Sequence, residues 1–310
     1  MISFSVVIPL YNKAPSIEKT MDSILNQRFP PTEIIIVDDG STDGGLEIVR
    51  SMSDARLKIL ETDHPRSGPS IARNIGIRAA RSLWIALLDA DDHWDEDYLH
   101  SAQAVLSESQ GDICCVMTAW RIEDGQNSKI SKIGRLYREK TQLDFKAFLL
   151  RWLSSSECPM WTSAVILSRA HMLQCGGFPE HVRRGEDKVA WFRIMQTGEG
   201  LYNPSPLATY AMGVAGQETT KFSNTLHPLC HEISQFESSA GVDATLLERL
   251  YNLQIIRYFK DIAFREKMSA AAIAGFHVRH DPFYYGAIQL SRNLPLGLLH
   301  CVAKILRKPR

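Results

Sequence analysis

The sequence predicts a mixed α/β fold with a doubly wound, mostly parallel sheet, followed by a helical C-terminal extension. Three observations lead to this prediction. Short apolar, β-branched runs alternate with amphipathic segments over residues 4–88. Two of these runs end in acidic turns, at the strand ends where open parallel sheets hold their ligands. From about Asp243 onwards the apolar residues recur at helical spacing instead.

The first half supplies the alternation in chain order. We expect strands over residues 4–12, 33–38, 57–60 and 84–88, and helices over residues 17–27, 46–52 and 68–80. Pro9 should end the regular pairing of the first strand, because proline has no N–H to donate. Ser16 is the candidate N-cap of the first helix.

The stretch Trp84–Trp94 is the centre of the predicted site. Its apolar residues indicate a strand buried on both faces, and three carboxylates follow at Asp89, Asp91 and Asp92. In an extended segment alternate side chains point the same way, so Asp89 and Asp91 would converge on one point, such as a hard cation. The alternative is a solvated acidic turn in which Asp92 or Asp95 caps the next helix. The triplet alone does not distinguish the two interpretations.

Composition argues against several functions. The 310 residues carry 35 basic and 35 acidic side chains, so bulk charge indicates no nucleic-acid partner. The six cysteines form no CxxC pair, and the adjacent Cys114 and Cys115 lie in an apolar run, which favours free thiols in a reducing compartment. No apolar run is long enough to cross a bilayer, and Met1–Phe4 runs straight into a strand, so we expect no signal peptide. Neither GxGxxG after the first strand nor a GxxxxGK-S/T motif is present, which argues against a dinucleotide fold or a P-loop enzyme.

The second half is less regular. Residues 113–117 predict a further buried strand, and residues 145–153 predict an apolar-faced helix. Residues 125–140 are polar and basic without clean periodicity, so we expect a long mobile loop of the kind that often forms a lid or a binding loop. Residues 158–167 predict a loop that leads into a strand, and a helix should begin after Gly185.

Six segments carry a resemblance to a known family: Val6–Asn12, Ile36–Asp43, Gly68–Gly76, Leu87–Asp92, Gly176–Phe178 and Gly185–Asp187. In this order they resemble family 2 of the glycosyltransferases, the inverting enzymes of the GT-A fold, of the type that builds bacterial cell-surface glycans. The resemblance covers residues 3–213. It implies a GT-A-like catalytic domain over residues 1–215, with a nucleotide-sugar half over residues 1–112 and an acceptor half over residues 113–215. Residues 216–310 would form the helical extension.

The resemblance implies that the first half binds a nucleoside diphosphate sugar. Pro9 and Tyr11 would border the nucleobase, and Asp39 would accept a hydrogen bond from the ring N–H of the base or from the ribose. Gly68 would let the backbone approach the ligand, and Arg73 would offer its planar set of donors to phosphate or base. The structural alternatives are that Tyr11 is a half-buried aromatic at a sheet edge and Arg73 an exposed arginine near a helix start.

The remaining acids of this half divide between structure and metal binding. Asp38 favours a turn, and Asp43 can cap the helix that follows it. The resemblance assigns Asp91 to direct contact with Mn²⁺ or Mg²⁺, and Asp89 to the ribose or a water-mediated shell. The metal would bridge the two phosphates and stabilise charge on the departing nucleoside diphosphate. Asp92 would join this shell or cap the next helix.

For the acceptor half, the resemblance implies that Asp187 is the general base and Glu186 its neighbour. An inverting transfer needs a carboxylate that faces the acceptor hydroxyl, and a helix N-terminus keeps that carboxylate ionised. The alternative for Asp187 is an ordinary acid in the first turn of a helix. Trp161 is either a sugar-stacking platform of the acceptor site or a core residue.

The sequence departs from the family after this helix. Members often carry a Tyr-Arg-x-His-like strand that reaches the diphosphate, whereas this chain has Tyr-Ala-Met-Gly at Tyr210–Gly213. Lys221, His227 and His231 are the candidates to replace the missing basic contact. His227 and His231 have helical i, i+4 spacing and are either metal ligands or ordinary surface histidines.

The C-terminal extension predicts one long amphipathic helix through Leu246, Leu250 and Phe259. Residues 294–310 then combine apolar residues with lysines and arginines, and no acidic residue follows Asp281. Such a tail fits the anionic face of a membrane, a helix packed on the catalytic domain, or a partner-binding tail. We expect the protein to be cytoplasmic, with peripheral contact to the membrane as one option.

These inferences predict an inverting glycosyltransferase that moves a sugar from a nucleotide-sugar, by resemblance a UDP-sugar, to a hydroxyl of a glycan or lipid-linked glycan acceptor. Two rival functions remain. A sugar nucleotidyltransferase would need a glycine-rich, basic triphosphate loop near the first strand, and none is visible. A non-catalytic sugar-nucleotide-binding protein would bind nucleotide without turnover.

Overall fold

A computed structural model describes residues 2–182, 184–213, 226–236, 242–262 and 270–293. The chain forms two compact units, residues 1–151 with 157–217 and residues 152–156 with 218–310. Lys221 and the basic tail over residues 294–310 lie outside the described residues. Within those residues, none of the helices combines the length and the hydropathy that crossing a membrane requires.

The strands of the sheet position the site. The described residues contain β1 (Phe4–Leu10), β2 (Glu33–Asp38), β3 (Leu57–Glu61), β4 (Trp84–Leu87), β5 (His93–Trp94), β6 (Ile113–Asp124), β7 (Asn127–Ile130), β8 (Thr141–Leu143), β9 (Val165–Ser168) and β10 (Glu199–Met212). The helices before residue 200 are α1 (Ala14–Leu25), α2 (Gly45–Ser51), α3 (Pro69–Ala79), α4 (Tyr98–Glu108), α5 (Lys132–Leu136), α6 (Phe145–Ser155), α7 (Arg169–Gln174) and α8 (Glu186–Ile194), with a 3-10 turn over Thr162–Ala164. Those after residue 200 are α9 (Pro228–Gln235), α10 (Ala244–Ile262) and α11 (Pro282–Asn293), with a 3-10 turn over Ala271–Ile273.

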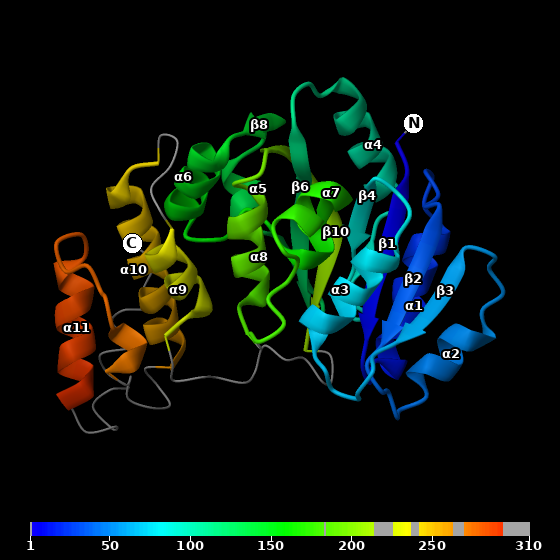
Figure 1. Ribbon diagram of the computed structural model, residues 1–310, viewed down its shortest axis with the longest axis horizontal. Helices are drawn as coiled ribbons and strands as arrows, with labels where there is room; N and C mark the ends of the chain where they lie inside the picture. The colour runs from blue at the N-terminus through cyan, green and yellow to red at the C-terminus, as the bar shows by residue number, and fades with distance from the viewer. Residues whose placement is uncertain (1, 183, 214–225, 237–241, 263–269, 294–310) are drawn as a thin grey trace. The chain divides into compact units, whose positions relative to one another are not determined.

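The sheet order is β3-β2-β1-β4-β9-β6-β10-β5, with β7 paired to β6 and β8 paired to β10 (Figure 1). The first four strands are parallel. After β3 the chain returns across the sheet to place β4 on the other side of β1, so right-handed crossovers put α1 and α2 on one face and α3 on the other. The carboxyl ends of β1 and β4 therefore form a topological switch point, which is where open α/β sheets bind ligands.

The parallel half confirms the predicted mixed α/β fold, and the other half adds antiparallel strands. β9 runs antiparallel between β4 and β6. β10 is parallel to β6 but antiparallel to β5 and β8. Local sequence patterns indicate that a segment is a strand but not the direction of its partner, so these reversals were not predicted.

Proline at position 9 does not end the first strand, which corrects the prediction. Pro9 stays opposite Val37 of β2, while the pairing of β1 with β4 stops at Val7 opposite Leu87. Val7 bonds toward β4, because its carbonyl accepts from the N–H of Leu88. Pro9 lies two residues further along and faces the same way, so its missing N–H falls where β4 has already ended.

Helix α3 lies unusually close to the sheet. A Cβ atom at Gly76 would be 2.3 Å from a side-chain methyl of Val7 on β1. Glycine is needed here for the close approach rather than for backbone freedom, since Gly76 lies inside a regular helix. This contact fixes the height of α3, and hence of Arg73, above the switch point.

Two local predictions were wrong. Helix α1 begins at Ala14, so Ser16 lies inside it and is no N-cap; its hydroxyl instead donates to the carbonyl of Ala90 at 2.9 Å. The segment expected to be a mobile loop is folded, because Gly125 (φ +59°) turns the chain back into the antiparallel β6–β7 hairpin and α5 follows. The sequence Asp124-Gly125 is a hairpin signal, but the loop was predicted from the absence of periodicity in the residues that follow.

The second unit contains the long amphipathic helix that the sequence predicted, α10, with Leu250, Ile255 and Phe259 buried. The amide of Asn252 anchors the turn that precedes α11. It donates to the carbonyl of His277 and accepts from the N–H of the same residue, both at 2.8 Å.

Candidate active site

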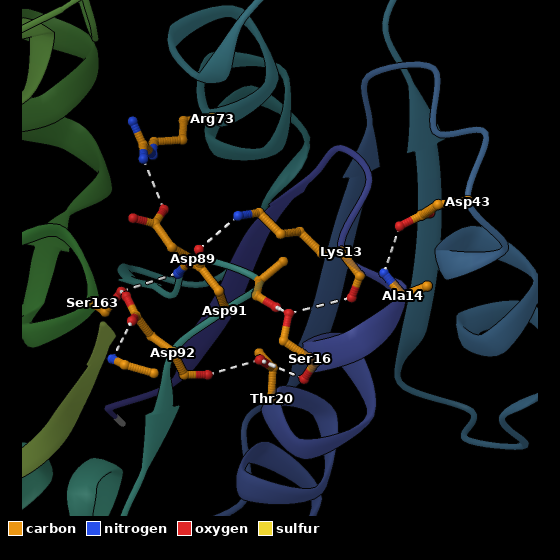
Figure 2. Close-up of polar contacts among 12 residues, drawn as sticks. Lys13, Ala14, Ser16, Thr20, Asp43, Arg73, Asp89, Asp91, Asp92 and Ser163 are labelled. Carbon is orange, nitrogen blue, oxygen red and sulfur yellow. Dashed lines mark hydrogen bonds and ion pairs between the residues drawn. The ribbon is translucent and has the colours of Figure 1, made fainter. Parts of the chain in front are cut away.

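Three strand ends meet at the carboxyl edge of the parallel half. After β1 the chain turns through Asn12, a residue type that tolerates its left-handed φ of +51°, and reaches Lys13. After β2 comes Asp39, and after β4 comes the acidic stretch Asp89–Asp92. Figure 2 shows Lys13 and Arg73 pointing at this acidic stretch from the β1 side and the α3 side.

Two of the predicted structural aspartates hold the turns around the site. Asp38 accepts hydrogen bonds from two backbone N–H groups of the turn after β2, at 3.1 Å each, which confirms its turn role. Asp43 accepts from the N–H of Gly45 at the start of α2, at 3.0 Å, as predicted. It also accepts from the N–H of Ala14 at the start of α1, at 2.8 Å, so one carboxylate serves both helix starts.

Asp39 is buried and holds the loop that leads into α3. Its carboxylate accepts from the hydroxyl of Thr62 and from the N–H groups of Ser67 and Gly68, each at 2.8 Å. Gly68 has φ +104° and precedes the first residue of α3, so its backbone is held at the site by Asp39. The predicted contact of Asp39 with a nucleobase or ribose stays a prediction.

Tyr11 and Pro9 are half-buried at the end of β1. The phenolic oxygen of Tyr11 accepts from Nε of Arg66 at 2.6 Å, and that guanidinium also lies 5.9 Å from the centre of the Tyr11 ring. Arg66 is exposed and has a left-handed φ of +61°. Sequence reasoning missed Arg66, although it stands two residues before the glycine that the resemblance singled out.

Arg73 is buried, with 5% of its surface exposed, so the alternative of an exposed arginine is wrong. Its guanidinium donates to Asp89 at 2.7 Å and to Glu186 at 3.2 Å, and it lies 5.3 Å from the ring centre of Phe178. Burial alone would lower the pKa of Arg73, but the two carboxylates overcome it and raise that pKa above its usual range. Arg73 therefore joins Asp89, at the end of β4, to the first turn of α8.

The acidic stretch forms a turn and not an extended segment. The N–H of Asp92 donates to the carbonyl of Asp89 at 3.0 Å, so the alternation that would make Asp89 and Asp91 converge does not apply. Asp89 faces Arg73, whereas Asp91 accepts from the Lys13 ammonium at 2.6 Å (Figure 2). The convergence of the two carboxylates on one point was therefore a wrong prediction.

Asp92 is 2% exposed and caps no helix, which corrects the capping role suggested for it, whereas its place in a metal shell stays a prediction. Its carboxylate accepts from the hydroxyl of Ser163 at 2.6 Å and from the N–H of Ala211 at 3.2 Å. Burial, then the charges of Asp89 and Asp91, raise the pKa of Asp92 well above its usual range. The carboxylate ties the end of β4 to the 3-10 turn and to β10. Asp95 caps no helix with its side chain either, but pairs with Arg121 at 2.7 Å.

Glu186 and Asp187 occupy the first turn of α8, after Gly185 with φ +75°. Burial and the charge of Asp187 raise the pKa of Glu186, and the guanidinium of Arg73 opposes the rise. Asp187 is half-buried and close enough to Arg73 to raise the pKa of that guanidinium. Asp187 thus lies at a helix N-terminus, as predicted. Its role as base stays a prediction.

Asn74 was missed, although it follows Arg73 directly. Its amide donates to the carbonyl of Phe178 at 2.8 Å and to Glu180 at 2.9 Å, and it accepts from the N–H of Phe178 at 2.9 Å. Gly177 packs on the same amide, because a Cβ there would lie 2.7 Å from the Asn74 oxygen. Neighbouring residues of α3 thus fix the Gly-Gly-Phe turn and the start of α8.

Trp161 is half-buried among aromatic residues. Its ring centre lies 5.7 Å from that of Trp120 and 5.3 Å from that of Tyr210. Tyr210 belongs to the altered Tyr-Ala-Met-Gly stretch, so an aromatic contact is present at this end of β10. Whether the Trp161 face stacks on an acceptor sugar stays a prediction.

The two histidines suggested as substitutes lie in the second unit. His227 is the N-cap of α9, and its Nδ1 accepts from the N–H of Leu229 at 3.2 Å. His231 is exposed on α9. Among the residues that the structure describes, no group of three or more His, Cys, Asp or Glu side chains is placed to hold a metal by itself.

A metal completed by a ligand does fit the chemistry of this edge. Mg²⁺ and similar hard ions are usually held by one or two carboxylates together with substrate phosphates. Asp91 offers such a carboxylate and already binds a cation, the Lys13 ammonium, at 2.6 Å. Asp91 is therefore the residue that would hold a divalent ion together with a diphosphate.

Comparison with solved structures identifies the class of fold. The chain superposes on Staphylococcus aureus TarS residues 1–349, solved in complex with UDP-GlcNAc, with a TM-score of 0.74 and 18% identity over 99% of this chain and 92% of that one. A mannosyltransferase from Pyrobaculum calidifontis, solved with GDP-Man and Mn²⁺, gives a TM-score of 0.60 and 20% identity over 97% of this chain and 86% of that one. The fold is a GT-A-like mixed α/β fold.

Sequence comparison then gives the family. The profile described as Glycosyl transferase family 2 matches residues 5–165, and the chain belongs to this family. The poly(ribitol-phosphate) β-N-acetylglucosaminyltransferase TarS of S. aureus is 32% identical over 119 residues, which are 37% of this chain and 21% of TarS. The putative teichuronic acid biosynthesis glycosyltransferase TuaG of Bacillus subtilis is 38% identical over 106 residues, or 34% of this chain and 42% of TuaG. The chain thus spans less than half the length of these curated relatives.

Proposed function

We propose that this protein is an inverting glycosyltransferase that takes its sugar from a nucleotide-sugar. One observation carries the proposal beyond family membership. Arg73 donates to Asp89 at the end of β4 and to Glu186 at the start of α8. The predicted donor edge and the predicted base therefore lie on two sides of one buried guanidinium. This arrangement supports a single displacement, in which base and leaving group act on opposite sides of one sugar carbon.

The donor-side residues would each contact a different part of the nucleotide. Pro9, Tyr11 and the loop held by Asp39 line the end of the sheet where a base would lie. Gly68 brings backbone close to the same place. Asp89 would accept from the ribose or from a metal-bound water, which its half-buried carboxylate can do while it pairs with Arg73.

Mn²⁺ or Mg²⁺ bound at Asp91 together with the diphosphate would neutralise charge on the leaving group. The chain's own residues do the rest. Asp187 takes the proton of the acceptor hydroxyl, whose oxygen forms a bond to the anomeric carbon. The bond from that carbon to the diphosphate oxygen breaks, and the nucleoside diphosphate leaves with the electron pair. Glu186, held by Arg73, keeps the start of α8 and therefore Asp187 in place.

We propose a UDP-sugar as donor and a hydroxyl of a bacterial surface glycan or lipid-linked glycan as acceptor. TarS in complex with UDP-GlcNAc is the similar structure that supports UDP. The names of TarS and TuaG, a poly(ribitol-phosphate) transferase and a putative teichuronic acid transferase, support a surface-polymer acceptor. The half-buried Trp161, beside Tyr210, is the proposed acceptor platform.

Calorimetric titration of UDP, GDP and CDP, each with and without Mn²⁺, tests the donor site on the full chain. We expect UDP to bind with Mn²⁺ and Asp91→Asn to weaken that binding about tenfold or more, because it removes the charged ligand of the metal. The matched control is Asp22→Asn, which changes an exposed acid on α1. A chain that binds none of the three nucleotides would refute the proposal.

An assay of UDP release from UDP-sugars then distinguishes an enzyme from a non-catalytic sugar-nucleotide-binding protein. Asp187→Asn should keep UDP binding within about twofold while turnover falls about 10²–10⁴-fold, the usual contribution of a general base. Equal release by wild type and Asp187→Asn would leave the non-catalytic binding function as the better account.

A further inference from the structure

The lysine after β1 was given no role by the sequence, yet it pairs with the carboxylate assigned to the metal. Nζ of Lys13 lies 2.6 Å from Oδ2 of Asp91, and the two side chains are only 14% and 11% exposed. A lysine ammonium is a compact cation that binds carboxylates and phosphates as a point charge. Lys13 therefore stands where a metal ion at Asp91 would also stand.

The backbone on both sides of this ion pair is fixed. The carbonyl of Lys13 accepts from the N–H groups of Ser16 and Ile17 in the first turn of α1, at 3.0 and 2.9 Å. Asp43 holds the N–H of Ala14, and the Ser16 hydroxyl donates to the carbonyl of Ala90, which precedes Asp91. Figure 2 shows the contact of Asp43 with Ala14 and the Lys13–Asp91 pair beside it. The backbone of Lys13 is thus held in place, and its long side chain carries the ammonium that meets Asp91.

The charges around the pair indicate where the ammonium would go. Arg73 is committed to Asp89 and Glu186, and Asp92 is bonded to neutral donors. A divalent ion and the Lys13 ammonium would repel each other if both lay next to the Asp91 carboxylate. A diphosphate brought by the same ion offers the ammonium several new anionic oxygens. Release of Lys13 from Asp91 is thus unfavourable for a metal alone and favourable for a metal with its diphosphate.

We propose that Lys13 is a built-in cation that occupies Asp91 in the empty enzyme, yields it to the divalent ion, and moves to the diphosphate of the nucleoside diphosphate. Lys13 makes metal binding depend on the nucleotide, and so acts as a positioning residue for the leaving group. This inference rests on the proposed function, because it takes the ligand of Asp91 to be a metal–nucleotide complex.

The test is calorimetric titration of the full chain with Mn²⁺ alone and then with UDP at saturating Mn²⁺. Lys13→Met keeps the length of the stem and removes the charge. We expect it to bind Mn²⁺ alone at least fivefold more tightly than wild type, and UDP with Mn²⁺ at least fivefold more weakly. The matched control is Lys19→Met, which changes an exposed lysine of the same helix and should leave both affinities within twofold.

Lys13→Arg keeps the charge, so it should bind Mn²⁺ alone and UDP with Mn²⁺ as the wild type does. This variant still tests the inference if circular dichroism shows that Lys13→Met folds poorly. Unchanged Mn²⁺ affinity in folded Lys13→Met, or an Arg variant that behaves like Met, would overturn the inference. A third result would also overturn the inference: wild type binds UDP equally well with and without Mn²⁺, and Lys13→Met does not bind UDP. Lys13 would then contact UDP without being displaced from Asp91 by a metal ion. The Mn²⁺-only titration needs no nucleotide, so its failure is distinct from a failure of the donor to bind.

Discussion

Replacement of Asn74 by alanine isolates the contact that ties α3 to the turn before α8. Asn74 is 4% exposed, and its amide makes hydrogen bonds to both the N–H and the carbonyl of Phe178 and to Glu180. Alanine removes all of these bonds without touching the charged residues of the site. The buried backbone groups of Phe178 are then left without these partners.

The size of the effect follows from those groups. A neutral hydrogen bond contributes about 1 kcal/mol net, and a buried backbone group left unpaired costs about 1–3 kcal/mol. Two such groups belong to Phe178, which is 1% exposed, while Glu180 is exposed and can turn to water. We expect Asn74→Ala to lower the free energy of unfolding by about 2–4 kcal/mol.

Urea unfolding of the full chain, followed by circular dichroism, measures this change at constant slope m. The control is Asn26→Ala, an exposed amide at the end of α1, which should change stability by less than about 0.5 kcal/mol. Asn74→Asp keeps the acceptor for the Phe178 N–H but cannot donate to its carbonyl, so it should also be destabilised at neutral pH. A loss below about 1 kcal/mol in Asn74→Ala would refute the assignment of this amide as the link between α3 and the turn.

Three further outcomes are expected. Arg73→Lys keeps the charge but cannot reach Asp89 and Glu186 together, so UDP release should fall about 10²-fold, and the melting temperature should also fall because one carboxylate loses its buried partner; unchanged turnover would argue against the bridge. Burial and two neighbouring acids raise the pKa of Asp92 in the folded chain, so the folded state holds a proton that the unfolded state loses above 3.8. This group therefore stabilises the fold at low pH and loses that contribution as pH rises toward its folded pKa, and Asp92→Asn should flatten the decline in urea stability as pH rises above 3.8. Gly76→Ala would place a Cβ 2.3 Å from a methyl group on β1 and should destabilise the chain by about 1–3 kcal/mol in urea, whereas a neutral result would mean that α3 can shift freely.

Much of the fold could be predicted from the sequence, because local residue patterns in the first half indicate its strands and helices. The apolar runs at residues 33–38 and 84–88 predict strands whatever their partners, and each acidic turn follows its strand in the chain. Parallel strands connected by helices leave few topologies, so the meeting of these turns at one sheet edge could be expected. The loop prediction for residues 125–140 failed because periodicity was weighed over the Asp124-Gly125 turn signal.

Chain-distant contacts were decided by the tertiary structure. The sequence supplied Lys13, Arg73 and Asp91 as charged residues near strand ends, but the partner of each charge depends on where α1, α3 and α8 lie. Lys13 meets Asp91 across 78 positions of the chain, and Arg73 meets Glu186 across 113. Local propensity acts over a few residues, whereas an ion pair depends on atoms brought within about 4 Å by the packing of the whole sheet. The sequence by itself therefore determined which groups are present and at which strand ends, and the packing decided that a lysine pairs with Asp91 and that one arginine joins Asp89 to Glu186.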